Sequence, residues 1–216
     1  MRVLLTAGPT YEPLDPVRFL GNRSTGKMGY AIAEEFARQG ADVLLISGPS
    51  QLPVPDNARI RTVRVETAAE MFAAAEAGAS AADVWVFAAA VADYRPAHVE
   101  AEKIKKSGDT LTLELVKNVD IAATLGRRKR AEQFAVGFAL ETTNELVHAQ
   151  GKLQRKGFDL IVLNSLRDAG AGFGHDTNKV TVLDAAGQIV NFELKSKADV
   201  ARDLVSLILA RLNRSA

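Results

Sequence analysis

The chain has no cysteine, and its 216 residues include only three histidines, one tryptophan and 6% aromatic residues. Without cysteine it forms neither a disulfide framework, a thiolate zinc site, an iron–sulfur cluster nor a thiol nucleophile. His98, His148 and His175 stand in unrelated sequence contexts, which argues against a histidine metal site. The absence of disulfide chemistry favours a cytoplasmic location.

Long hydrophobic runs and an excess of one charge are also absent. The longest apolar run, 84–92, is shorter than the roughly 20 residues that a membrane-spanning helix needs. Residues 3–5 are too short a run for a signal peptide, so we expect the mature chain to begin here. Lys and Arg number 27 against 26 Asp and Glu, a net charge of +1. This balance disfavours nucleic-acid and membrane partners, and any anion site has to be local.

What is present is typical of a folded globular protein of one domain: 47% hydrophobic and 25% charged residues. Short apolar runs alternate with helical patterns along most of the chain. Strands are predicted at 3–6, 43–46, 60–65, 84–89, 134–138 and 160–163, and helices from 24 or 25 to 40 and at 67–79, 143–156 and 198–212. This alternation predicts an α/β fold with a doubly wound, Rossmann-like and mainly parallel sheet.

Two segments depart from this pattern. Residues 110–116, and the pair 179–183 and 189–194, alternate polar and apolar residues with period 2, as antiparallel strands with one wet face do. We expect a small antiparallel side subdomain, approximately 96–118 and 167–196, beside a core of 1–95, 119–166 and 197–216. Both parts belong to a single domain of residues 1–216. Such strands need a partner for one face, which predicts a homodimer.

The segment from Gly21 to Met28 nearly spells a phosphate-binding P-loop. The P-loop interpretation fails for two reasons. Met28 stands where a Ser or Thr must bind magnesium, and no apolar strand immediately precedes Gly21. A Gly, Ser and Thr-rich loop that opens a helix remains, with exposed N–H donors at the positive end of the helix dipole. Polar neighbours favour an anion site over an ordinary helix cap: Arg18, Asn22, Arg23 and Lys27.

Other segments carry weaker signals. The turn at 6–10 resembles the first βα turn of a dinucleotide fold but lacks the full G-x-G-x-x-G fingerprint, and 88–94, with Asp93, follows another predicted strand. The basic run 103–106 is either solvated surface or a mobile flap that closes over phosphates. The run 127–130 ends a helical pattern, where positive charge suits the dipole. Residues 170–174 are expected to form a flexible loop.

Taken together, eight motifs in order resemble the phosphopantothenoylcysteine synthetase family over nearly the whole chain. They are 6–10 (TAGPT), 12–18 (EPLDPVR), 22–29 (NRSTGKMG), 89–94 (AAVADY), 103–106 (KIKK), Lys117-Asn118, Gly137-Phe138 with Glu141-Thr142, and Phe173 with Asp176 and Asn178.

The resemblance implies the phosphopantothenate–cysteine ligase reaction of coenzyme A biosynthesis. In that family the carboxylate of 4′-phosphopantothenate attacks the α-phosphate of CTP, pyrophosphate leaves, and the amine of L-cysteine displaces CMP from the acyl-cytidylate. No protein nucleophile is required, which agrees with the lack of cysteine. The resemblance also implies Mg²⁺ or Mn²⁺ as cofactor and a homodimer.

Carried over position by position, the family pattern makes Asn22 and Lys103 catalytic. Asn22 would donate to the oxyanion of the acyl intermediate, and Lys103 would offset charge on the leaving pyrophosphate. The substrate is assigned to Arg18, Asn22 and Ala89, with the guanidinium on the phosphate of phosphopantothenate. The nucleotide is assigned to Phe87, Ala88, Ala89, Asp93, Lys103, Val119, Asp120, Ile121, Ala122, Phe138, Lys152 and Lys156. The last two lie four apart on one helical face, and the ligands of the metal ion are left unassigned.

Two departures from the family pattern are visible. Val119 stands where many relatives have proline, and many relatives carry a flavin-dependent decarboxylase before the first ligase strand. The chain is therefore expected to be a stand-alone synthetase or the excised half of a bifunctional enzyme. Two alternatives stay open: a nicotinamide-dependent oxidoreductase, against which the incomplete fingerprint counts, and a nucleotide-sensing or nucleic-acid-binding module that uses the runs 103–106 and 127–130.

Overall fold

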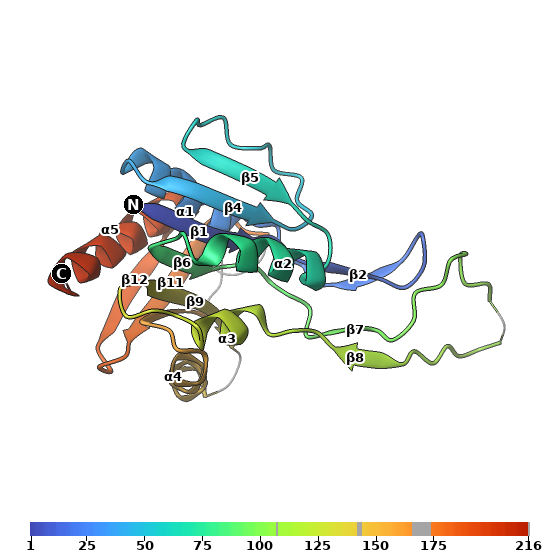
Figure 1. Cartoon of the computed structure of the whole chain (residues 1–216). Coiled ribbons are helices and arrows are strands. Elements are labelled where there is room, and N and C mark those ends of the chain that lie inside the picture. The colour runs from blue at the N-terminus through green and yellow to red at the C-terminus, as the bar shows by residue number, and fades with distance from the viewer. Residues whose placement is uncertain (107, 142–143, 166–173, 216) are drawn as a thin grey trace.

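The computed structural model describes residues 1–106, 108–141, 144–165 and 174–215, and its centre is an eight-stranded sheet of order β12-β11-β10-β9-β6-β1-β4-β5 (Figure 1). Six strands run parallel: β1 (Arg2–Ala7), β4 (Asp42–Ser47), β5 (Ile60–Arg64), β6 (Val84–Phe87), β9 (Phe134–Glu141) and β10 (Leu160–Ser165). The prediction of a mainly parallel sheet is confirmed.

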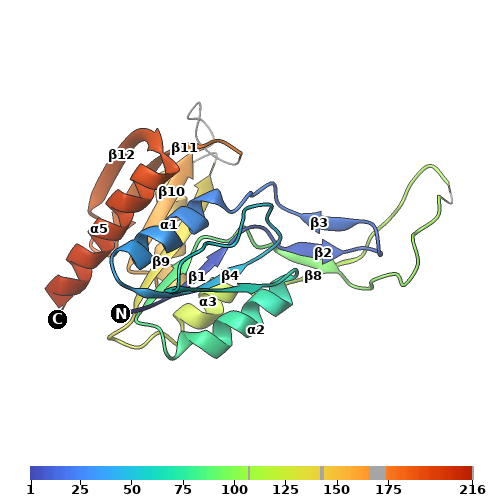
Figure 2. The same cartoon turned by 90° about the horizontal axis from the view of Figure 1, so that it is seen from above.

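Helices cover both faces of this sheet (Figure 2). One face carries α1 (Lys27–Arg38) and α5 (Lys197–Ser215), and the other carries α2 (Ala68–Ala79), α3 (Ile121–Gly126) and α4 (Glu145–Lys156). Local sequence explains where α2 begins. Thr67 accepts a hydrogen bond from the N–H of Glu70, and the Glu70 side chain accepts from the N–H of Thr67, which completes a capping box. The doubly wound arrangement is confirmed.

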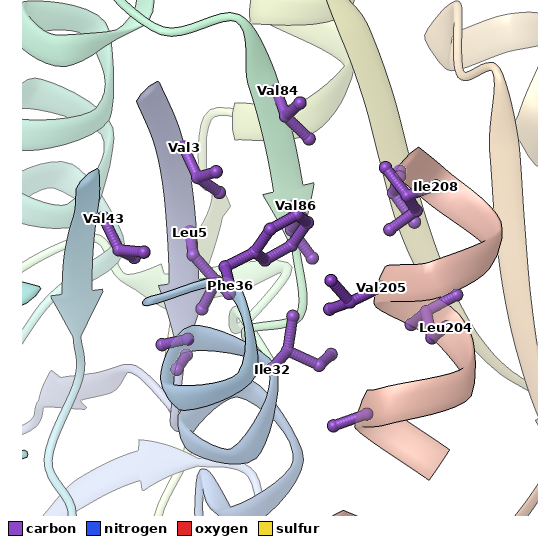
Figure 3. Close-up of a cluster of buried hydrophobic side chains, with 14 of the residues drawn as sticks. Val3, Leu5, Ile32, Phe36, Val43, Val84, Val86, Leu204, Val205 and Ile208 are labelled. Atoms are coloured by element: carbon purple, nitrogen blue, oxygen red, sulfur yellow. The ribbon is translucent and has the colours of Figure 1, made fainter. Parts of the chain in front are cut away.

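The core has two layers because successive side chains of each strand point to opposite faces. In Figure 3, strand residues such as Val3, Leu5 and Val86 point toward Phe36 of α1 and Leu204 of α5. The neighbours Leu4 and Trp85 pack in the other cluster, against α2. Strands buried on both faces read as continuous apolar runs, which is the pattern from which they were predicted.

The assignment of 179–194 to a side subdomain was wrong. These residues form the antiparallel hairpin of β11 (Thr177–Asp184) and β12 (Ile189–Ser196), and β11 pairs with β10, so the hairpin extends the main sheet. The period-2 pattern marks a sheet edge whose outer face meets water, and mixed sheets with antiparallel edge strands are common. Of the predicted subdomain, residues 107 and 167–173 lie outside the described residues.

A two-stranded arm does lie apart from the sheet. Its strands are β7 (Tyr94–Pro96) and β8 (Leu115–Lys117), and the segment between them projects away from the body (Figure 1). The strand predicted at 110–116 is thus shorter and later than expected. The arm lies beside a second short hairpin, β2 (Tyr11–Pro13) and β3 (Phe19–Gly21), where the sequence pattern predicted a loop. Within the described ranges, no helix combines the length and apolar character that crossing a bilayer requires.

Candidate active site

Two adjoining hollows open at the carboxyl ends of β1, β6 and β9. The strand order reverses at this point, since β4 and β5 lie on one side of β1 and β6 and β9 on the other. Open α/β sheets bind ligands at such a switch point. The hollows share four lining residues, so a bound molecule can extend from one into the other: Ala89, Val91, Phe138 and Lys152.

The first hollow brings together ten of the twelve residues predicted to bind nucleotide. They come from the ends of β6 and β9, the loop after β6, the start of α3 and one side of α4: Phe87, Ala89, Asp93, Val119, Asp120, Ile121, Ala122, Phe138, Lys152 and Lys156. Ala88 lines the second hollow, and Lys103 lines neither.

Aromatic rings wall the first hollow. The rings of Phe87 and Phe158 stack with centroids 5.9 Å apart and an interplanar angle of 29°, and Phe138 is the third aromatic residue of the lining. Phe158 fits because residue 137 is glycine: a Cβ there would lie 1.9 Å from the Phe158 ring. The prediction did not include Phe158, since nothing in the residues after α4 distinguishes it from a core phenylalanine.

Asn118 fastens the loop that carries Asp93. Its Nδ2 donates to the carbonyl of Ala92 at 2.8 Å, and its backbone N–H donates to the carbonyl of Asp93 at 2.9 Å. Arg95 donates to the Asn118 side chain in turn. Asn118 therefore ties the loop after β6 to the end of β8 and lines the first hollow itself. It belonged to a matched motif but received no role from the sequence.

Two lysines from α4 face the hollow, each paired with a carboxylate from another element. Lys152 Nζ lies 2.6 Å from Oε1 of Glu141, the last residue of β9. Lys156 Nζ lies 3.0 Å from Oδ2 of Asp120, which also caps α3 by accepting the N–H of Ala123. The expected spacing of four residues on one helical face holds, and it places two cations along one wall.

The second hollow is formed around the start of α1. Gly26 precedes this helix in a left-handed conformation (φ 83°), and no described side chain caps the first turn. The N–H groups of that turn are therefore available to an anion in the hollow that Ser24, Thr25 and Gly26 line. Asn22 lies in the same lining, and its Nδ2 donates to the carbonyl of Ala90 at 2.9 Å.

Two lysines also line the second hollow: Lys27, which the sequence placed at an anion site, and Lys197, which the sequence did not predict. Lys197 is buried, and its ammonium donates to the carbonyls of His175 and Thr177. Burial and the nearby Lys27 lower the pKa of Lys197, against the opposing effect of Asp176. Lys27 pairs with Asp176 at 2.5 Å and thereby lowers the pKa of that carboxyl. Lys197 was missed because it reaches the site from the start of the last helix.

Arg18 and Lys103 are not brought to either hollow. The guanidinium of Arg18 bonds the Asp15 carboxylate through Nε (3.0 Å) and Nη2 (2.5 Å), and it also donates to the carbonyl of Ile104. Burial opposes ionisation of Asp15, but bonds from Arg18 and the N–H groups of Val17, Ile104 and Arg18 hold its pKa well below the usual range. This junction anchors the arm that carries Lys103 on the β2–β3 hairpin.

No group of three or more His, Cys, Asp or Glu side chains converges to hold a metal ion within the ranges that the structure describes. These residues therefore offer no protein-only cage for Mg²⁺ or Mn²⁺. Mg²⁺ usually keeps several waters and binds through one or two carboxylates together with substrate phosphates. Thr142 and Phe173 of the matched motifs lie outside the described residues.

Comparison with known proteins gives matches along the whole chain. The family model of the DNA/pantothenate metabolism flavoprotein C-terminal domain matches residues 1–212. A prokaryotic protein described as a cysteine/cysteine sulfinic acid decarboxylase is 47% identical over 96% of this chain and 58% of its own length. The coenzyme A biosynthesis bifunctional protein CoaBC of Haemophilus influenzae is 43% identical over 100% of this chain and 53% of its own length. The chain thus spans little more than half of these relatives.

One solved structure matches this chain over nearly the whole length of both proteins. The crystal structure of the C-terminal domain of the coenzyme A biosynthesis bifunctional protein CoaBC superposes with a TM-score of 0.83 at 41% identity, covering 99% of this chain and 96% of that one.

Proposed function

The chain belongs to the DNA/pantothenate metabolism flavoprotein C-terminal domain family, and from this membership we propose that it joins 4′-phosphopantothenate to L-cysteine with consumption of CTP. One observation carries the proposal: ten residues that the ligase pattern assigns to the nucleotide line one hollow at the switch point of the sheet. The CoaBC proteins it resembles are named for coenzyme A biosynthesis. The decarboxylase name belongs to a relative of which this chain covers 58%, and it is not extended to this chain.

In the first step, a carboxylate oxygen of 4′-phosphopantothenate attacks the α-phosphorus of CTP. A P–O bond forms to the acyl oxygen, and the bond to the β-phosphate bridging oxygen breaks, which releases pyrophosphate. The ring wall of the first hollow suits the cytidine, and the ammonium groups of Lys152 and Lys156 suit the phosphates. Activation is needed because a carboxylate has no adequate leaving group of its own.

In the second step, the amine of L-cysteine attacks the carbonyl carbon of the acyl-cytidylate. A C–N bond forms, the C–O bond to CMP breaks, and the amine loses a proton. Negative charge builds on the carbonyl oxygen, and Asn22 beside Ala90 can donate an N–H to it from the second hollow. One such donor contributes about 3 kcal/mol to transition-state stabilisation. The first turn of α1 adds backbone N–H groups on the same side.

A divalent cation enters this scheme with the nucleotide. Mg²⁺ or Mn²⁺ bound to the triphosphate is part of the substrate. Asp93 and Asp120 both line the first hollow, and because Asp120 is paired with Lys156, Asp93 is the carboxylate better placed to face the cation. Lys103 and Arg18 keep their predicted roles on the pyrophosphate and on the substrate phosphate only if the arm moves or a second copy of the chain supplies them, since both lie outside the hollows.

The test is to incubate the chain with 4′-phosphopantothenate, L-cysteine, Mg²⁺ and either CTP or ATP and to measure pyrophosphate. We expect turnover with CTP to exceed turnover with ATP, because a wrong base leaves buried polar edges unpaired at a cost of about 1–3 kcal/mol. Omitting cysteine should limit pyrophosphate to about one per site. Equal turnover with both nucleotides contradicts the CTP assignment, and no pyrophosphate with any nucleotide contradicts the ligase.

No observation favours the nicotinamide-dependent alternative. The turn after β1 reads Ala7-Gly8-Pro9-Thr10, without the later glycines that let a backbone approach a dinucleotide pyrophosphate. A titration that follows nicotinamide fluorescence tests it directly.

A further inference from the structure

Lys152 holds a special place among the site residues because it lines both hollows, whereas Lys156 lines only the first. It shares the junction with Ala89, Val91 and Phe138, none of which carries a charge. Under the proposed function, the acyl group in one hollow meets the α-phosphate in the other at this junction. An ammonium there is the charge closest to the reacting atoms.

Glu141 determines where that ammonium lies. Its side chain is only 15% exposed, and Oε1 is 2.6 Å from Lys152 Nζ. Beyond this ion contact, no hydrogen bond from the described part of the chain reaches Oε1, which is buried. Nδ1 of His148 approaches the other oxygen at 3.4 Å. A buried carboxylate needs a cation beside it, so the pair restrains both partners.

The second ion pair of α4, between Lys156 and Asp120, differs from the first because its carboxylate is more exposed to water. The Asp120 side chain is 50% exposed, and it caps α3 whether or not Lys156 is beside it. Breaking that pair leaves a solvated carboxylate with its own hydrogen bond. The two lysines lie four residues apart on one helix and have similar N···O distances to their carboxylates, so the exposed pair is a matched control for the buried one.

We propose that Glu141 is a positioning residue that holds the Lys152 ammonium at the junction of the two hollows. This inference rests on the proposed function and adds to it a residue that acts through Lys152 without touching the substrate. When the carboxylate is lost, the flexible lysine side chain regains rotamer freedom and its ammonium moves toward water. A charge accelerates a reaction when it is already in place as the transition state forms.

The experiment is a double-mutant cycle on kcat/KM for CTP in the full chain. We expect E141Q to lower kcat/KM about tenfold, which is less than the roughly hundredfold loss on removing a preorganised donor, because the Lys152 charge is displaced and not removed. In the K152M background the same change should have less than about a twofold effect, because its target is gone. In the K156M background the tenfold loss should persist. Thermal unfolding of each variant checks folding, and E141D replaces E141Q in the cycle if the amide variant does not fold.

Three results overturn the inference: additive losses in E141Q/K152M, coupling of the same size to Lys156, or a kcat/KM in E141Q equal to or above that of the unaltered chain. The last result would mean that Glu141 only competes with phosphates for Lys152. An unaltered chain that neither binds CTP nor forms product overturns the proposed function, and this inference with it. An active unaltered chain with an additive cycle overturns this inference alone.

Discussion

Asn22 and Asp15 lie seven residues apart near the start of the chain, and each acts through hydrogen bonds with backbone groups. Asn22 donates one N–H to the carbonyl of Ala90. A carboxamide nitrogen carries two N–H donors, so a second is left for a ligand in the hollow. The Asp15 carboxylate accepts hydrogen bonds from the Arg18 side chain and from three backbone N–H groups. Its capacity to accept hydrogen bonds is therefore used within the chain.

Asn22→Asp should separate the two half-reactions. The carboxylate removes the donor and repels the oxyanion of the second step, so the acyl-cytidylate should form and then accumulate. Rapid-quench assays should show a pyrophosphate burst of about one per site without matching amide product. Asn164→Asp adds the same charge elsewhere in the lining of that hollow and should not trap the intermediate. If Asn22→Asp releases no pyrophosphate at all, Asn22 acts in activation instead.

Asp15→Asn should loosen the junction between the arm and the β2–β3 hairpin. The N–H of Ile104 would lose its ionised acceptor, and Arg18 its partner, so amide exchange at Val17, Arg18 and Ile104 should quicken. Unchanged exchange at all three amides would show that the charge of Asp15 does not hold this junction.

The same carboxylate predicts how the junction responds to acid. Because the pKa of Asp15 is lowered from 3.8, the stability that its carboxylate gives to the junction is fully present above pH 3.8. This stability is lost only as the pH falls through the lowered pKa. The amide shift of Ile104, followed by NMR, should therefore stay constant while ordinary aspartates titrate. A midpoint near 3.8 would show that Asp15 is not held by these bonds.

Among the elements, β9 contributes to the site in three ways. Gly137 gives Phe158 its space, Phe138 lies between the hollows, and Glu141 at the end of the strand meets Lys152. Residues 137 and 138 point to opposite faces because side chains alternate along a strand. A single strand thereby contacts α4 on one side and both hollows at its end.

Gly137→Ala should damage stability and nucleotide binding together. The added Cβ would lie 1.9 Å from the Phe158 ring, which has to move and shift Phe87, its stacking partner. Overpacking of this kind costs about 1–3 kcal/mol of unfolding free energy. Denaturant unfolding measures the stability, and calorimetric titration with CTP should show weaker binding in the folded variant. Loss of stability with unchanged CTP affinity would separate Phe158 from the nucleotide.

At the scale of the whole molecule, the arm is the part that the fold leaves uncovered. The arm carries Lys103, a predicted catalytic residue that lines neither hollow. It also carries five large apolar side chains that are exposed to water: Tyr94, Val99, Leu111, Leu113 and Leu115. Projecting apolar surface of this kind marks contact with another molecule.

We therefore predict a homodimer in which the arm takes part. Light scattering should give twice the chain mass of 23.2 kDa at micromolar concentration. The double change of Leu111 and Leu113 to glutamate should shift the mass toward the monomer while thermal stability of the body is kept, because these side chains are exposed in the single chain. A mass near 23.2 kDa for the unaltered chain would contradict the dimer.

The sequence was sufficient for most of the local structure, and its family resemblance named most of the residues that line the first hollow. Apolar runs such as 84–87 predicted strands buried on both faces, and the helical pattern that begins at Thr67 predicted a helix start, because these patterns depend on neighbours along the chain. It was insufficient for β2 and β3, three residues each, which are too short to show a period.

The residues by themselves determined the α/β class, the strands and helices of the body, and the motifs that identify the family. Only the tertiary structure decided that the β11–β12 hairpin joins the main sheet, that Arg18 bonds Asp15 instead of lining a hollow, and that Glu141 meets Lys152. The physical reason is the separation along the sequence over which each interaction acts. Hydrophobic periodicity and capping act between residues a few positions apart, whereas pairing of an edge strand, burial of a carboxylate and the choice of its cation depend on segments that only the folded chain brings together.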